Sequence, residues 1–120
     1  MEVIYSYTRA DAIADGMQVK CELATEAGFK YPVYITKGIN DLINKSLKYG
    51  ANDYNGVMWD FLSVLKAEIR KQQATDLVQS HVYINWQCNR PKIFHFQAQI
   101  GALDFDDAQP AITIMLPDED

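Results

Sequence analysis

The sequence has little of what most recognisable sites are built from. It contains two cysteines, Cys21 and Cys88, and two histidines, His81 and His95, and its six glycines form no phosphate-binding loop. It has no uninterrupted apolar run of about 18 residues, so no transmembrane helix and no membrane partner are predicted. Its N-terminus lacks the basic and apolar segments of a signal peptide. We therefore expect a cytoplasmic protein with reduced thiols, and a Cys21–Cys88 disulfide is the less favoured alternative.

Acidic residues outnumber basic ones, and the excess of acidic residues is confined to the C-terminal part of the chain. The chain has 16 acidic and 11 basic residues and a net charge of −5 at pH 7. Six of the acids lie in residues 101–120, which contain no base, so the first 100 residues carry 10 acids against 11 bases. Phosphates would be repelled by the acidic end of the chain. We predict no nucleic-acid partner.

Three runs of alternating apolar and polar residues dominate the C-terminal part of the chain. They span residues 78–88, 92–100 and 112–116. A period of two predicts strands with one buried face. The short link between the first two runs makes them antiparallel neighbours. Residues 101–110 are interpreted as a longer acidic connection to the third strand.

The N-terminal half is patterned mainly for helices. Thr8 followed by Asp11 is typical of a capping box, and the short helix that it begins should end at Gly16. Thr36 can cap a second helix, and a third is predicted over residues 57–72 from its apolar stripe. We predict a single α+β domain over residues 1–120, with N-terminal helices packed on one face of a C-terminal three- to four-stranded antiparallel sheet.

The histidines are the natural candidates for a metal ion or for acid–base chemistry, but the predicted register separates them. If the hairpin turns at residues 89–91, His95 faces Asn85, and a register shifted by two places it beside Tyr83 or Gln87. His81 is then at least two residues away along the strand, and in the central register four, about 14 Å at ~3.4 Å per residue. Neither histidine belongs to a metal-binding motif. We predict no catalytic residue, no metal site and no cofactor. Cys88 falls on the inward parity and is predicted to be buried.

The outward face of the predicted hairpin is rich in amides and aromatic rings and nearly free of charge. Interfaces are enriched in aromatic residues and depleted in Lys and Glu. This face is therefore a candidate protein-binding surface, with coverage by the chain's own N-terminal segment or a helix as the alternative. Its residues are Gln79, His81, Tyr83, Asn85, Gln87, His95, Gln97 and Gln99.

Both ends of the chain carry distinctive motifs. Residues 7–16 read Tyr-Thr-Arg-Ala-Asp-Ala-Ile-Ala-Asp-Gly, and residues 112–120 read Ile-Thr-Ile-Met-Leu-Pro-Asp-Glu-Asp. Together with Gly56, Trp59 and Asp60 between them, these motifs resemble a small bacterial family of unknown function carried on plasmids, phages and other mobile elements. The resemblance implies no catalytic residues. Members of that family often have a basic or glycine-rich segment before the last strand, whereas this chain is acidic there.

Two functional classes follow from these observations. The first is a non-enzymatic protein-binding module of a mobile genetic element, acting on a protein partner or as a homodimer. The mobile-element setting that the resemblance implies favours an inhibitor of a host defence system. The alternative is a small enzyme with an unrecognised active site, which would need a pocket that brings an Asp or Glu beside His95.

Overall fold

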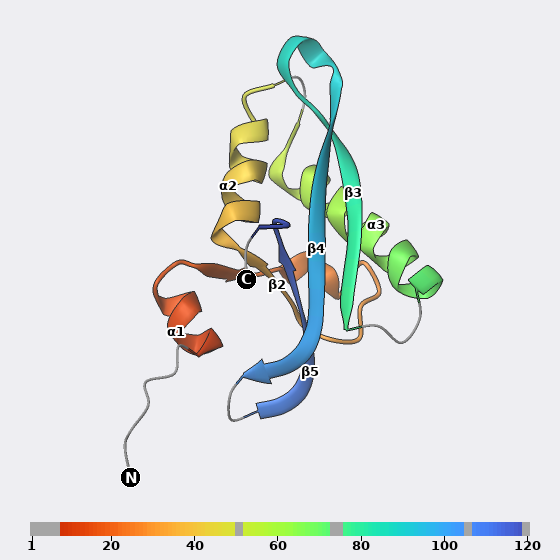
Figure 1. Ribbon diagram of the computed structural model, residues 1–120. Coiled ribbons are helices and arrows are strands. Elements are labelled where there is room, and N and C mark those ends of the chain that lie inside the picture. The colour runs from red at the N-terminus through yellow and green to blue at the C-terminus, as the bar shows by residue number, and fades with distance from the viewer. Residues whose placement is uncertain (1–7, 50–51, 73–75, 105–106, 119–120) are drawn as a thin grey trace.

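The computed structural model describes residues 8–49, 52–72, 76–104 and 107–118. Its core is a five-stranded sheet in the order β1-β2-β5-β4-β3. In Figure 1, α3 passes behind the long β3–β4 hairpin and α2 lies to the left of it. The elements are α1 (Arg9–Ala14), β1 (Gln18–Lys20), η1 (Glu22–Ala24), β2 (Val33–Thr36), α2 (Lys37–Ser46), α3 (Tyr54–Gln72), β3 (Leu77–Asn85), η2 (Gln87–Asn89), β4 (Pro91–Asp104) and β5 (Asp107–Met115).

The sheet is mixed and uses strands from both halves of the chain. β2 runs parallel to β5, with Val33 opposite Ile112, while every other neighbouring pair is antiparallel. The predicted α+β class, with helices packed on the sheet, is confirmed. The three- to four-stranded antiparallel sheet is wrong, because β1 and β2 add two strands and β2 pairs in parallel with the last strand.

The connection predicted over residues 101–110 is also wrong for the residues that the structure describes. β4 continues to Asp104 and β5 begins at Asp107, with Gly101 opposite Ala111, so the two strands form a second hairpin. Most side chains in this extension are exposed, so burial imposed no alternation that the sequence could display.

One face of the sheet and the helices α2 and α3 enclose the hydrophobic core. Phe61 of α3 meets Phe96 of β4 edge to face, with ring centroids 5.3 Å apart, and both side chains are almost fully buried. α2 begins as predicted, since the Thr36 hydroxyl accepts the Ile39 N–H at 3.4 Å. Each large side chain buried in this layer stabilises the fold by about 1.5–3 kcal/mol.

The short helix α1 contacts the opposite face of the sheet. Its predicted capping box is confirmed: the Asp11 N–H donates to Thr8 Oγ1 at 3.0 Å, and the Thr8 N–H donates to Asp11 Oδ2 at 3.1 Å. Gly16 follows at φ 77°, where a glycine is favoured. Across the described ranges, no helix combines the length and apolar character needed to cross a lipid bilayer.

Candidate functional site

The β3–β4 hairpin positions the candidate site, and its register differs from the prediction. The strands are linked by a turn centred on Cys88, closed by a hydrogen bond from the Trp86 N–H to the Arg90 carbonyl at 2.8 Å. His81 therefore lies directly opposite His95, and Asn85 lies opposite Pro91. The expectation that the histidines lie four residues apart is wrong, because it placed the turn at residues 89–91.

Cys88 is exposed at the tip of this turn, which corrects the prediction that it is buried. Its φ of 59° lies in the left-handed region, so the chain leaves the strand conformation before the alternating pattern ends. Cys21 is buried, and both thiols are free.

The arm of the hairpin near the turn is held against α2 by aromatic rings. The Trp86 ring lies 4.8 Å from that of Tyr49, just after α2, and 4.9 Å from that of Phe94. The Lys92 ammonium lies 5.3 Å from the Phe94 centroid and 5.8 Å from that of Trp86. Cation–π contacts of this kind add about 0.5–1 kcal/mol each at exposed sites. Together these contacts hold the arm in one orientation, with its outward face away from Tyr49.

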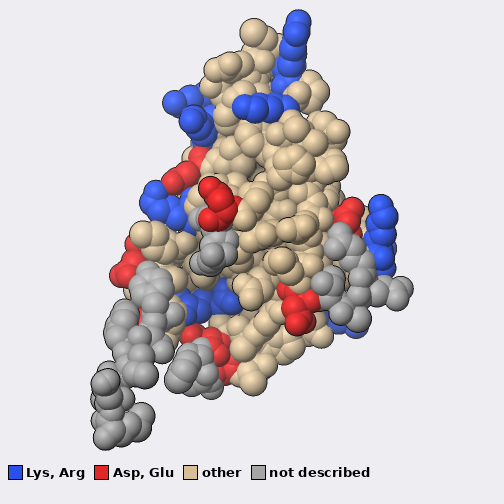
Figure 2. Space-filling model, in the orientation of Figure 1, with Lys and Arg blue, Asp and Glu red and all other residues tan. Residues whose placement is uncertain are grey.

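Most of the predicted residues lie on this outward face as expected. Gln79, His81, Tyr83, Asn85, His95 and Gln99 are exposed on the two strands. Gln87 is exposed but belongs to the 3-10 turn η2, not to the strand. Gln97 lies on the same face but is only 9% exposed. Figure 2 shows that the visible face over the hairpin is largely without charged side chains.

An open groove of about 600 Å³ runs along this face. Its wall includes Pro117, which follows β5 and brings the C-terminal segment beside the hairpin. The remaining lining residues come from the middle of β3 and β4: Gln79, Ser80, His81, His95, Phe96 and Gln97. Among the residues that the structure describes, none that lines the groove is an Asp or Glu.

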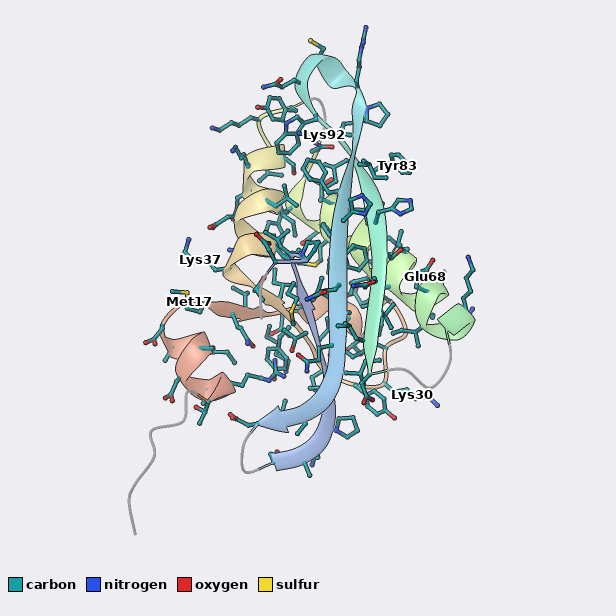
Figure 3. The ribbon with its side chains drawn as sticks, viewed as in Figure 1. Met17, Lys30, Lys37, Glu68, Tyr83 and Lys92 are labelled. Atoms are coloured by element: carbon teal, nitrogen blue, oxygen red, sulfur yellow. The ribbon has the colours of Figure 1, made fainter. Side chains whose placement is uncertain are left out.

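Rings of the outward face lie in a row across the two strands. The His81 ring centroid is 5.9 Å from that of His95 and 5.6 Å from that of Tyr83. Tyr83, labelled in Figure 3, is 62% exposed, and its cross-strand partner Ile93 is 41% exposed. Sequence reasoning missed Ile93, because its alternation was counted from Phe94, although Ile93 shares the parity of His95 and Gln97.

β3 is an edge strand without the usual protection. Among the described residues its ladder is with β4 alone. Its hydrogen-bonded pairs include Trp86–Arg90 and Asp76–Ile100, so the even-numbered residues bond to β4 and the odd-numbered ones direct their backbone groups to the other side. The side-chain amide of Asn52 donates to the outward Asn85 carbonyl at 2.8 Å. The nine residues of β3 include no proline and no Lys, Arg, Asp or Glu, the residues that usually block pairing of an edge strand.

A second polar cluster surrounds Arg9, and the sequence analysis missed it. The guanidinium donates to Gln18 Oε1 and Thr113 Oγ1, each at 2.9 Å, and to the Leu103 carbonyl, and it lies 4.4 Å from the Tyr34 ring centroid. Burial lowers the pKa of Arg9 from its ordinary value, although the group remains charged. Three hydrogen bonds of this guanidinium are made within the chain, so Arg9 ties α1 to the sheet.

The Arg9 cluster is completed by a carboxylate. The backbone N–H groups of Arg9 and Ala10 donate to the two oxygens of Asp104, each at 3.0 Å. Asp104 belongs to the acidic segment that the sequence analysis treated as a solvated connection. Part of that negative charge is therefore used internally, at the start of α1.

Metal-ligating residues do not gather in larger groups. Among the described residues, no group of three or more His, Cys, Asp or Glu side chains could hold a metal ion together. The two histidines are thus a pair without a third protein ligand of these types.

Comparison with known proteins adds no assignment. No protein-family model, curated protein or solved structure matches this chain.

Proposed function

We propose that this chain is a non-enzymatic protein-binding module and that it binds its partner with the outward face of the β3–β4 hairpin. The observation that supports this is an exposed row of rings and amides, bordered by a groove and carrying no fixed charge. Aromatic and amide groups can be desolvated at lower cost than Lys or Glu, because no full charge leaves water. A face of this composition is suited to burial against another protein.

The partner's chemistry is suggested by the edge beside this face. An extended, weakly charged segment of another protein could add to β3 as a further strand, using the outward backbone groups of His81 and Tyr83. Its side chains on the groove side would then meet Tyr83 and His81. Main-chain pairing would supply affinity, and the groove would supply selectivity.

The biological setting of the proposal comes from the sequence motifs. The resemblance of residues 7–16 and 112–120 to a family carried on mobile elements favours a host protein in the bacterial cytoplasm as the partner. Within that setting, the role we propose for the module is inhibition of a host defence system. A dimer formed through the same face is the competing outcome that the experiment must separate.

The test begins with a variant that charges the face without unfolding the hairpin. Tyr83→Lys combined with Ile93→Glu places opposite charges at directly opposed positions, which favours pairing of the two strands and leaves the net charge unchanged. Gln97, although on this face, is unsuitable because it is nearly buried. The matched control is Asn44→Glu with Leu47→Lys, two exposed positions at the end of α2.

Capture from a bacterial lysate with mass spectrometry identifies the partner, and titration of the purified pair measures affinity. We expect the hairpin variant to bind at least about 30-fold more weakly, the effect of losing ~2 kcal/mol from a central contact, and the control to bind like the parent. Equal binding by all three proteins would reject the proposed face. Sedimentation of the parent and the variant shows whether the occupant is instead a second copy, in which case the variant alone becomes monomeric.

A separate pair of variants distinguishes binding through the backbone of the β3 edge from binding through the Tyr83 side chain. Tyr83→Thr keeps the outward N–H and removes the ring, while Tyr83→Pro removes both, at an edge where proline is tolerated. If a partner strand adds to β3, the proline variant should bind more weakly than the threonine variant. Equal affinity would show that only the side-chain face is used.

A further inference from the structure

We infer that His81 and His95 form a two-ligand binding site for a divalent transition-metal ion of the Zn²⁺ or Ni²⁺ type. Their direct opposition across β3 and β4, with ring centroids 5.9 Å apart, is the observation that carries the inference. It does not depend on the proposed protein-binding function.

The backbone brings the two side chains unusually close. His81 and His95 occupy a non-hydrogen-bonded position of the antiparallel ladder, because the even-numbered residues form the hydrogen-bonded pairs. Such positions hold their Cα atoms about 4.5 Å apart, closer than hydrogen-bonded ones. Two side chains that leave the same face from this separation can converge on one ion.

The ring geometry is compatible with shared coordination. A tetrahedral ion bound at about 2.0–2.1 Å by each imidazole needs the two ring nitrogens a little over 3 Å apart. The rings lie at 65° to one another, and small rotations about their side-chain bonds bring a nitrogen of each toward a common point. The edge-to-face contact with Tyr83, at 89°, restricts the ring of His81 on its other side.

The imidazole nitrogens are also uncommitted. Both side chains are exposed, and within the described part of the chain neither takes part in a hydrogen bond or an ion pair. Among the described residues that line the groove there is no Lys or Arg to repel a cation. The groove is open to water, so water oxygens can fill the remaining coordination positions.

Imidazole selects the class of ion. It suits zinc, copper and nickel, whereas calcium and magnesium prefer oxygen ligands. With two protein ligands the bound ion retains exchangeable positions, so it binds more weakly than at a closed four-ligand site. The ion would join β3 to β4 and stabilise the hairpin that presents the outward face.

Titration with Zn²⁺ and with Ni²⁺, followed by calorimetry and by the histidine ring signals in NMR spectra, tests the inference. All proteins carry Cys88→Ser, so that the exposed thiol does not capture the ion. We expect one ion per chain in the parent, with the ring signals of both histidines shifting together. His81→Gln and His95→Gln should each weaken binding by at least about tenfold.

The matched control keeps two histidines but separates them. His95→Gln combined with Gln99→His moves the second imidazole four residues along the exposed face of β4, roughly 14 Å at ~3.4 Å per residue. This variant should bind no better than a single-histidine variant. If this control variant binds the ion as tightly as the parent, the inference is wrong. Ring shifts confined to one histidine of the parent would also overturn it, and that result does not depend on how well any variant folds.

Discussion

Arg9 shows how one residue can join elements that are distant in sequence. Its side chain reaches Leu103 and Thr113, 94 and 104 residues further along the chain, and also Gln18 after α1. The capping box at Thr8 was predictable because its partners lie within one helical turn. The role of Arg9 was not predictable, since nothing near it in sequence indicates which distant acceptors it will meet.

Removing the Arg9 side chain should therefore destabilise the fold without altering any side chain of the outward hairpin face. We expect Arg9→Ala to lower the free energy of unfolding by about 2 kcal/mol, because several acceptors of a charged donor lose their partner together. Arg9→Lys should recover only part of this loss, since an ammonium cannot reproduce the guanidinium fork. Urea denaturation measures both.

Ile13→Ala, at an exposed position of the same helix, provides the control and should change stability by less than about 0.5 kcal/mol. A loss for Arg9→Ala no larger than this would mean that the Arg9 contacts contribute little to the folded state.

At the scale of elements, the alternating pattern identified β3, most of β4 and the second half of β5, although residues 111–115 of β5 are all buried, and it missed β2. The alternation over residues 78–88 and 92–100 corresponds to β3 and to most of β4. In β2, Val33, Tyr34 and Ile35 are all buried, because Arg9 covers Tyr34 from one side and the core encloses its neighbours. β2 thus has three consecutive buried residues that are all apolar or aromatic, and it displays no alternation. In the equally buried β5, the polar Thr113 between Ile112 and Ile114 kept the pattern visible.

The alternating pattern also predicted which residues form the outward face, but it did not predict the register between β3 and β4. Parity alone placed the amides, the histidines and Tyr83 on one face. Their pairing depended on the turn, where Cys88 adopts a left-handed conformation that a residue of its type seldom takes. One local conformation thus decided whether the histidines meet.

The contact between α3 and the sheet should dominate the stability of the two layers. Phe61→Ala removes a fully buried ring that meets Phe96, and we expect a loss of about 3–5 kcal/mol in the free energy of unfolding. Trp59→Ala, two residues earlier and 41% exposed, is the matched large-to-small change and should cost clearly less. Thermal and urea unfolding of both variants test this. Equal losses would contradict the assignment of the core-facing side of α3.

At the scale of the whole molecule, the two thiols differ in how far the protein must unfold before each can react. Cys21 is 5% exposed within the core cluster, and burial raises the pKa of its thiol, whereas Cys88 lies at the surface of the hairpin turn. The thiolate is the reactive form, so a raised pKa lowers the reactive fraction at a given pH. The burial of Cys21 and the raised pKa of its thiol therefore both slow its modification.

We expect the native protein to react quickly at one thiol, Cys88, and slowly at Cys21. The slow rate should rise with urea as steeply as global unfolding requires, since Cys21 becomes accessible only when the core opens. Time-resolved alkylation with mass spectrometry assigns each site, and Cys88→Ser should leave no fast phase. Two thiols that react at one common rate would show that the N-terminal part of the core opens independently.

The position of β5 has a consequence for the order in which the protein is made. β5 is the last strand in the sequence, yet it lies in the middle of the sheet, between β2 and β4. During translation β1 and β2 emerge early and β3 and β4 later, and the two groups have no shared neighbour until residues 107–115 have left the ribosome. The exposed edges of β2 and β4 must therefore remain unpaired, or be shielded by other proteins in the cell, until residues 107–115 have emerged and can pair with both.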